Sequence, residues 1–465
     1  MKENVPSAFR ESILECVGGT PLVKLTKVAA GVKATVLAKL EYLNPGGSVK
    51  DRVGLAMIEA AEKTGLIRPG YTIVEPTSGN TGLGLALAAA IKGYKIIFTV
   101  PDKMSKEKVD LLRAYGAKVI VTPTAVSPDH PSNYIQVAQR IVKTTPNAFM
   151  PNQYLNQANP EIHYKTTGPE IWTQTDGKVD VLVAGMGTGG TITGTGRYLK
   201  EKNPRMRVVG VDPAGSMFHH TFRGTSGNIH PYLIEGIGED FMPSTLDLNV
   251  VDDVIKVTDK DAFLTARSLA GEEGLLCGGS SGAAAYVALR VAKDLEGDKT
   301  VVVILPDTGR NYLNKIYSDE WMMQHGFLES REERIAVSDI LKRKSRGLEK
   351  LITLSPGDTV ETAVSLMKKH GISQIPVVKD GVQVGSIRDV ALMGGLTNKK
   401  FFHDQRIEDV MEEPLQSIGI QHSIMRPVSF LKEKNAFVVT DAGKIVDIIA
   451  TIDVIDYLIW KETSK

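Results

Sequence analysis

Apolar residues in the first 320 positions follow two alternating patterns. Short runs rich in valine and isoleucine predict buried strands, and longer stretches with apolar residues at helical spacing predict helices between them. Runs of this kind, separated by helices, indicate a mostly parallel sheet covered on both faces. Strands are predicted over residues 35–40, 72–75, 95–100, 118–121, 179–184, 207–211 and 300–305, and helices over residues 51–65, 82–92, 106–115 and 281–295.

The pattern changes after Gly326, where a charged segment leads into two short units that resemble each other. Each unit predicts a helix, a strand, a tight Asp/Gly turn and a second strand that ends at an aspartate, Asp389 or Asp453. The helices are predicted over residues 358–371 and 422–434, and each aspartate is expected to cap the helix that follows it. A unit repeated twice indicates a pseudo-symmetric pair with one shared core. We therefore expect an α/β domain at 1–325, a linker at 326–335, and two small α+β domains at 336–396 and 404–465.

Composition narrows the classes of function. The 465 residues are too many for one ordinary core, and 55 basic against 54 acidic residues leave no surplus charge for nucleic acid or an anionic membrane. The two cysteines, Cys16 and Cys277, cannot form a disulfide framework, and no CxxC or HExxH pattern predicts a metal site. Apolar runs stay below the roughly 18 residues of a membrane span, and the N-terminus lacks a signal-peptide core. We expect a soluble cytoplasmic protein.

Three glycine-rich turns, each between a predicted strand and a predicted helix, carry the candidate chemistry. The first, residues 44–52, contains Lys50. A solvated turn lysine is the ordinary interpretation, but a desolvated lysine loses its proton more readily and becomes a nucleophile. The second, residues 75–82, offers amides and hydroxyls to a carboxylate or phosphate, and Asn80 adds a donor for a ring oxygen. The third, residues 185–191, would cradle a phosphate with its backbone N–H groups and two threonine hydroxyls.

The third turn taken alone also fits a dinucleotide site. Gly185, Gly187 and Gly190 satisfy the G-x-G-x-x-G pattern, and Asp212 ends the next predicted strand. That interpretation leaves Lys50 and the second turn without a role. A monophosphorylated aldehyde cofactor would use all three turns.

A fourth glycine-rich segment, residues 277–283, opens another predicted helix. Ser280 or Ser281 would ordinarily cap the N-terminus of that helix. The functional interpretation is a hydroxyl that faces a pyridine nitrogen. A neutral partner does not hold that nitrogen protonated as an aspartate would, which favours loss of a β-leaving group over reactions that need a long-lived carbanion.

In this order and spacing, residues 48–52, 77–82 and 187–191 resemble the motifs of the fold-type II pyridoxal-phosphate enzymes, the tryptophan synthase β-like family. Within it, residues 10–325 are similar to the cystathionine-forming enzymes, with O-acetylserine sulfhydrylases as near kin. Residues 335–462 resemble a tandem CBS-domain (Bateman) module. The resemblance implies pyridoxal 5'-phosphate as the cofactor and a homodimer or larger homo-oligomer.

The resemblance also implies roles for individual residues. Lys50 would hold the cofactor covalently and act as the α-proton base. The remaining cofactor contacts are implied at Asn80 (ring hydroxyl), Ser280 (ring nitrogen), and Gly187, Thr188, Gly189, Gly190 and Thr191 (phosphate). The amino-acid substrate is implied to lie against Thr77, Ser78, Thr81, Gln153 and Gly236, the last in a closing loop. An adenosyl ligand such as S-adenosylmethionine would bind the C-terminal pair near Gln374, Asp389 and Asp453.

Three features depart from the family's pattern. Animal relatives carry an N-terminal haem-binding segment, for which there is no room before residue 10, so haem is not expected. Eukaryotic relatives have a tyrosine where this chain has Glu239, directly after residues 235–238. Ala450 stands three residues before Asp453, where nucleotide-binding versions often have a hydroxyl, whereas Ser386 keeps that hydroxyl.

The implied reaction is a β-replacement in which the thiol of homocysteine displaces the hydroxyl of serine to give cystathionine, with hydrogen sulfide production from cysteine as a related activity. An enzyme alternative is a cysteine synthase that uses O-acetylserine and sulfide, although such relatives usually lack the C-terminal pair. A non-enzyme alternative is an adenosyl-nucleotide sensor whose first domain is a partner surface. The combination of Lys50, Asn80 and the phosphate turn argues against it.

Overall fold

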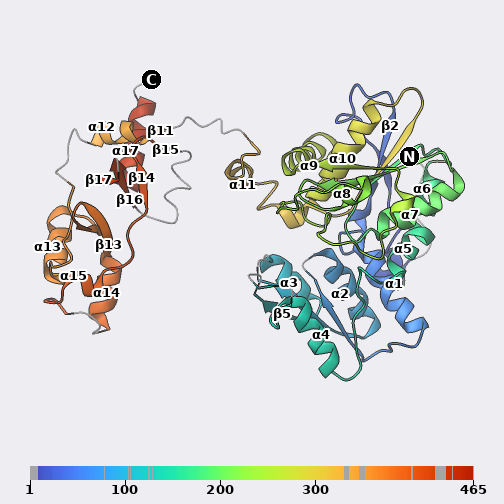
Figure 1. Cartoon of the computed structure of the whole chain (residues 1–465), viewed down its shortest axis with the longest axis horizontal. Helices are drawn as coiled ribbons and strands as arrows, with labels where there is room; N and C mark the ends of the chain where they lie inside the picture. The colour runs from blue at the N-terminus through green and yellow to red at the C-terminus, as the bar shows by residue number, and fades with distance from the viewer. Residues whose placement is uncertain are drawn as a thin grey trace. The chain divides into compact units, whose positions relative to one another are not determined.

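The chain forms two compact units, Met1–Leu328 and Glu329–Lys465, which we describe separately (Figure 1). The structure is a computed structural model, and it describes residues 9–463 except 78, 103, 105, 124–125, 128, 329–334, 345–350, 399–401, 425–435 and 442. Most of the predicted linker therefore lies outside the described residues. None of the helices within these ranges is long and apolar enough to cross a membrane.

Two mostly parallel sheets form the framework of the first unit. The larger has the strand order β1-β2-β10-β7-β8-β9, in which only β1 is antiparallel, and the smaller has the order β5-β4-β3-β6. The strands are β1 (Leu22–Lys24), β2 (Thr35–Leu40), β3 (Thr72–Pro76), β4 (Lys95–Pro101), β5 (Lys118–Thr122), β6 (Ala148–Phe149), β7 (Val181–Gly185), β8 (Arg207–Pro213), β9 (Asp253–Val257) and β10 (Thr300–Leu305).

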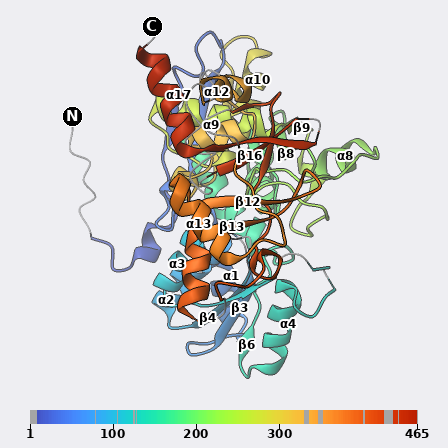
Figure 2. The same ribbon diagram turned by 90° about the vertical axis from the view of Figure 1, so that its left-hand side faces the viewer.

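Helices lie around these sheets (Figure 2). Successive residues of a strand point to opposite faces, so Val181 and Val183 belong to one buried cluster, while Leu182 and Ala184 belong to another. Burial on both faces explains the near-continuous apolar runs in the sequence. The helices are α1 (Lys50–Lys63), α2 (Asn80–Lys92), α3 (Lys106–Ala114), α4 (Tyr134–Thr144), α5 (Ala158–Ile162), α6 (Gly168–Gln174), α7 (Gly190–Lys202), α8 (Phe218–Arg223), α9 (Asp259–Glu273), α10 (Gly279–Lys293) and α11 (Asp319–Gln324).

The predicted elements of this unit are all present, with ends that differ by no more than two residues. The expectation of a mostly parallel α/β fold is confirmed. Sequence reasoning missed β1, β6 and β9. The first two are only three and two residues long, and β9 has lysine and aspartate within it, so none shows a continuous apolar run.

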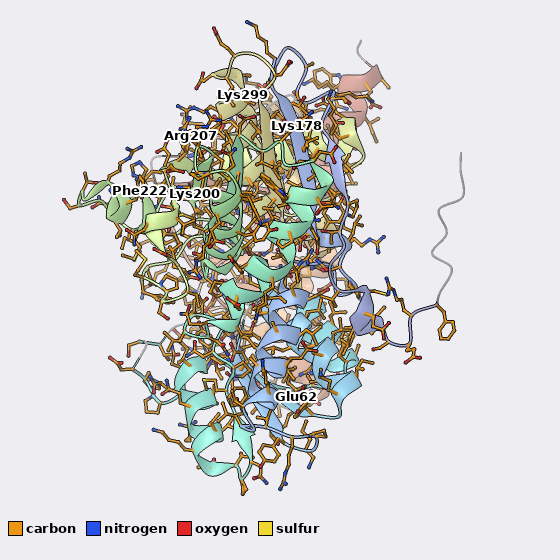
Figure 3. The ribbon with its side chains drawn as sticks, turned by 90° about the vertical axis from the view of Figure 1, so that its right-hand side faces the viewer. Glu62, Lys178, Lys200, Arg207, Phe222 and Lys299 are labelled. Carbon is orange, nitrogen blue, oxygen red and sulfur yellow. The ribbon has the colours of Figure 1, made fainter. Side chains whose placement is uncertain are left out.

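The strands of the larger sheet place their carboxyl ends along one edge. There β2, β7 and β10 end at Leu40, Gly185 and Leu305, close before residues 44–52, residues 186–191 and Asp307. Figure 3 labels Lys178, Arg207 and Lys299 near the amino ends of β7, β8 and β10, at the opposite edge. Ligands of open parallel sheets bind beyond the carboxyl ends.

The second unit contains two hairpins with separate cores. β12 and β13 form one antiparallel pair, and β16 and β17 form another to which β14 adds in parallel. The described apolar residues form two clusters, so the expected single shared core is not what the structure has. The elements are β11 (Ile335–Ala336), α12 (Val337–Lys344), α13 (Val360–His370), β12 (Gln374–Lys379), β13 (Val382–Arg388), α14 (Asp389–Thr397), α15 (Ile407–Val410), β14 (Ser417–Gly419), β15 (Ser423–Ile424), β16 (Ala436–Asp441), β17 (Lys444–Ala450) and α17 (Thr451–Thr463).

Two sequence predictions for this unit need correction. The helix predicted over residues 422–434 is wrong at its start, because Ser423–Ile424 pairs with β11 as a strand, and residues 425–434 lie outside the described residues. Neither aspartate is the N-cap residue of its helix: Asp453 is the third residue of α17, and its Oδ2 reaches back to accept a hydrogen bond from Ala450 N at 2.8 Å. Asp389 is the first residue of α14, and its Oδ1 accepts a hydrogen bond from the adjacent Val390 N.

Candidate active site

Lys50 begins α1, directly after a glycine-rich turn. Its side-chain nitrogen has no hydrogen-bond or ion-pair partner among the residues that the structure describes. Burial lowers the pKa of Lys50, and the negative charges of Asp307 and Glu239 oppose that shift. A lowered pKa makes the neutral, nucleophilic amine more accessible at neutral pH.

A glycine contact holds α2 against the start of α1. A Cβ at Gly84 would lie 2.3 Å from the Lys50 carbonyl oxygen, and a Cβ at Gly54 would lie 2.4 Å from the Gly84 carbonyl carbon. Only glycine at these two positions lets the helix backbones come this close. The N-terminus of α2, with Asn80, is thereby brought to the side of Lys50.

The second turn gathers polar side chains in a buried cluster. Thr77, Thr81 and Gln153 are each less than one tenth exposed, and the Thr81 hydroxyl donates a hydrogen bond to Gln153 Oε1. The Glu75 carboxylate accepts from the backbone N–H groups of Asn152 and Gln153 and so fixes their loop. Ser78, the remaining predicted carboxylate contact, lies outside the described residues.

The third turn has the form of an anion cradle at the N-terminus of α7. Within the described residues, the backbone N–H groups of residues 187–191 donate no hydrogen bond, and the helix dipole adds positive potential there. A Cβ at Gly187 would lie 2.8 Å from the Gly236 carbonyl oxygen, and one at Gly190 would lie 2.0 Å from Asn159 Oδ1. Gly189 has a φ of 82°, which favours glycine.

Asn159 links this cradle to the second turn, although sequence reasoning did not single it out. Its Nδ2 donates to the Gln153 carbonyl at 2.9 Å and to the Thr188 hydroxyl oxygen at 3.0 Å. Thr188 therefore keeps its own hydrogen for an anion. The Thr191 hydroxyl lies 3.2 Å from His163 Nε2, and burial lowers the pKa of His163 to about 3, which keeps that ring neutral.

Asp307 joins the remaining predicted ring contacts. Asn80 Nδ2 donates to its carboxylate at 2.9 Å, and the Ser280 hydroxyl donates to it at 3.4 Å. Gly236 lies close by, since a Cβ there would be 4.0 Å from Ser280 Oγ. The sequence signal for Asp307 was a carboxylate just beyond a buried parallel strand, where such sheets bind ligands.

Glu239, noted in the sequence as a departure, faces the same region. Its carboxylate accepts a hydrogen bond from the Tyr154 hydroxyl at 2.9 Å, and its backbone N–H and carbonyl both bond to the Ser216 hydroxyl at 3.1 Å. Burial raises the pKa of Glu239 to about 7, while Tyr154 and Lys50 lower it. This carboxyl therefore titrates near neutral pH beside Lys50.

The predicted regulatory residues lie in the second unit, and they differ in how exposed they are and in whether they already have a partner. Gln374 pairs with Arg388 across β12 and β13, Asp389 follows directly as the first residue of α14, and the Asp389 side chain is exposed. Asp453 is 10% exposed and lies 3.3 Å from the Lys344 ammonium group. The Ser386 hydroxyl, which the first repeat keeps, donates to the Glu413 carbonyl at 2.6 Å.

The first unit's residues fit a phosphorylated aldehyde. An amine without a partner, an N–H cradle without internal acceptors and a second N–H on Asn80 supply the contacts that such a molecule needs. The dinucleotide alternative fits poorly, because Asp212 is fully buried and accepts from His219 N, so its carboxylate cannot reach a ribose hydroxyl.

Comparison with known proteins agrees with this chemistry. Residues 13–307 match the family model of pyridoxal-phosphate dependent enzymes, and residues 337–396 match that of the CBS domain. The chain is 48% identical to cystathionine beta-synthase of Oryctolagus cuniculus over 83% of this chain and 70% of the relative. It is 41% identical to cystathionine beta-synthase of Dictyostelium discoideum over 98% of this chain and 93% of the relative. An O-acetylserine dependent cystathionine beta-synthase from Helicobacter pylori has a TM-score of 0.62 and 41% identity, over 67% of this chain and 100% of that one.

Proposed function

This chain belongs to the pyridoxal-phosphate-dependent enzymes and, within them, to the cystathionine β-synthases, and we propose that it replaces the hydroxyl of serine by the thiol of homocysteine. It is a lyase that uses pyridoxal 5'-phosphate, and it carries a C-terminal CBS domain. The observation that supports the proposed reaction most is that one unit combines three features: a Lys50 amine without a partner among the described residues, a backbone N–H cradle at residues 187–191, and a separate buried site that contains Thr77 and Thr81.

Each part of the first unit has a proposed task. When bound, the cofactor supplies an electron sink for the substrate's α-carbon. Lys50 holds the cofactor, and its free amine moves the α-proton. The backbone of residues 187–191 holds the phosphate, and Asn80 and Ser280 contact the ring. The substrate carboxylate binds at Thr77, Ser78, Thr81 and Gln153, with Gly236 in the loop above.

The leaving group has a second candidate. The Helicobacter pylori relative, 41% identical and matched over its whole length, is described as O-acetylserine dependent. Acetate is a better leaving group than hydroxide and needs no proton from the enzyme. O-Acetylserine with homocysteine is therefore the alternative pair, and O-acetylserine with sulfide is the cysteine synthase reaction.

Steady-state kinetics of the full-length enzyme with these three substrate pairs tests the proposal. We expect the highest kcat/KM with serine and homocysteine. A higher value for O-acetylserine with homocysteine would assign the alternative leaving group. Preference for sulfide over homocysteine would reject cystathionine formation as the main activity.

The C-terminal unit is proposed to bind an adenosyl ligand that regulates the first unit. We propose that Gln374 and Asp389 contribute more to ligand binding than Asp453, because the Asp453 carboxylate already pairs with Lys344 and Ala450 N. Calorimetric titration with S-adenosylmethionine should lose binding in Asp389→Ala and keep most of it in Asp453→Ala. Absence of binding by the wild type would reject this ligand.

The proposed assembly is a cytoplasmic homodimer or larger homo-oligomer, with domains at 1–325, 336–396 and 404–465. Both cysteines are free, Cys16 exposed and Cys277 buried, which suits a reducing compartment. Sedimentation of the purified protein over a concentration series would show the oligomer, and a monomer throughout would contradict it.

A further inference from the structure

The Asn159 side chain lies between the two sites assigned above to the phosphate and to the substrate carboxylate. It is 1% exposed, and both hydrogens of its amide nitrogen are used. One is donated to the Gln153 carbonyl at 2.9 Å and the other to the Thr188 hydroxyl oxygen at 3.0 Å. Its Oδ1 is buried and accepts no hydrogen bond within the described residues. The two donated bonds therefore set the direction of this amide.

Gln153 is held at every polar group except its own side-chain nitrogen. Its backbone N–H donates to the Glu75 carboxylate at 3.3 Å, its carbonyl accepts from Asn159, and its Oε1 accepts from the Thr81 hydroxyl. Within the described residues, Nε2 of Gln153 donates no hydrogen bond. The two hydrogens on Nε2 are thus left for a carboxylate, and the three bonds that hold the residue decide where they point.

Thr188 is held in a similar way on the side of the cradle. Its hydroxyl oxygen accepts from Asn159, and its carbonyl accepts from the Thr245 hydroxyl at 2.5 Å. The single hydrogen of a hydroxyl turns about the C–O bond to suit its acceptor. When a phosphate in the cradle takes this hydrogen, a lone pair of Thr188 faces Asn159. That bond fixes the Asn159 amide, whose other hydrogen fixes the Gln153 carbonyl.

We propose that Asn159 is a positioning residue that couples the two sites. A phosphate bound in the cradle orders Gln153 through Thr188 and Asn159, and so raises the affinity for the substrate carboxylate. This inference rests on the proposed function, because it takes residues 187–191 as the phosphate site and Gln153 as a carboxylate contact. A side chain that is ordered before its ligand arrives loses less conformational entropy on binding. Because coupling between binding sites is reciprocal, the carboxylate also raises the affinity for the phosphate.

Binding of L-alanine to the cofactor-loaded, full-length enzyme tests this coupling. L-Alanine has the carboxylate but no β-leaving group, and the change in cofactor absorption on its addition gives its dissociation constant. At saturating cofactor, we expect this constant to rise about tenfold in Asn159→Ala and about fivefold in Thr188→Val, as loss of a buried hydrogen bond would give. In the double variant the rise should stay near that of Asn159→Ala, because both substitutions break the same bridge.

The matched control is Asn203→Ala. Asn203 also donates from its Nδ2 to a backbone carbonyl, that of Val179 at 3.2 Å, but it lies at the C-terminal end of α7, at the opposite end from the cradle. The dissociation constant of L-alanine should not change in this variant. Thr188→Ser, which keeps the hydroxyl, should bind L-alanine nearly as the wild type does.

An unchanged dissociation constant in Asn159→Ala would overturn the proposal, as would an equal rise in Asn203→Ala. A rise in the double variant that equals the product of the two single rises would also overturn it. If Asn159→Ala does not fold, the two Thr188 variants decide, because equal affinity for L-alanine in Thr188→Val and Thr188→Ser would leave the bridge without effect. A wild type that binds neither the cofactor nor L-alanine would instead contradict the proposed function itself.

Discussion

Arg52 donates hydrogen bonds from Nε and Nη2 to the two oxygens of Glu41, at 2.8 and 2.9 Å, and both side chains are buried. The same guanidinium bonds to Glu170, which also pairs with the buried Lys39. Two cations and two anions thus balance inside the protein. Because Arg52 is two residues after Lys50, this network anchors the helix turn that presents the lysine.

Breaking this pair should destabilise the first unit. Glu41→Gln leaves a buried guanidinium with fewer negative partners, and loss of one member of a buried ion pair costs about 3–5 kcal/mol. Thermal unfolding should show a clearly lower Tm. Glu161→Gln, which removes the exposed Lys165–Glu161 pair, should change stability by less than about 1 kcal/mol. Similar shifts in the two variants would contradict the role given to the buried network.

Asp51 should make stability fall between acid and neutral pH. Burial raises its pKa from 3.8 to about 7 in the folded protein. The folded state therefore keeps a proton that the unfolded state loses, so its contribution is present below about pH 4 and is lost as pH rises through 7. Asp51→Asn stays uncharged at every pH. At pH 8 it should therefore be more stable than the wild type by up to about 4 kcal/mol in the free energy of unfolding, which a higher Tm would show. The difference should vanish near pH 4, and a constant difference would refute the assignment.

Gly84→Ala should displace the start of α1. The new Cβ would lie 2.3 Å from the Lys50 carbonyl oxygen, which is backbone and cannot turn aside. We expect the free energy of unfolding to fall by about 1–3 kcal/mol. We also expect weaker cofactor binding when the apoprotein is titrated. The control is Gly271→Ala, which lies in α9 with open space around it, and its free energy of unfolding should rise by up to about 1 kcal/mol. Normal cofactor affinity in Gly84→Ala would show that this contact does not position Lys50.

Ionisation of Glu239 should produce a change in kcat/KM near pH 7. Its pKa is about 7, and its charge raises the pKa of Lys50, so ionisation changes the lysine that moves the proton. The pH profile of kcat/KM should lose this step in Glu239→Gln. In Tyr154→Phe the step should move to higher pH, because the Tyr154 hydrogen bond lowers the pKa of Glu239. A step that stays in Glu239→Gln would belong to another group.

The sequence predicted the first unit well because its elements carry strong local signals. Buried parallel strands are continuous apolar runs, and the glycine-rich turns follow them directly, so Lys50, Asn80 and residues 187–191 could be found by their position. The contacts between these turns could not be predicted from the sequence. Asp307 and Asn159 are 227 and 29 residues away from the partners they hold, Asn80 and Thr188, and no local pattern marks such pairs.

The second unit was harder to predict because its elements are short. Asp389 and Asp453 occupy equivalent places in the repeat, yet only the Asp453 side chain reaches back to a backbone N–H that precedes its helix. Pairing with Lys344, far away in sequence, sets Asp453 apart, and a repeat cannot reveal that difference. The two-residue strand Ser423–Ile424 has no signal of its own, since it exists only through pairing with Ile335–Ala336.

The proposed role of Lys50 is to hold the cofactor through its side-chain amine. Borohydride reduction of the cofactor-loaded enzyme, followed by peptide mass mapping, tests it most directly. We predict reduced cofactor on Lys50 alone, and Lys50→Ala should carry no label and show no turnover. A label on another lysine, or turnover retained by Lys50→Ala, would rule out this role for Lys50.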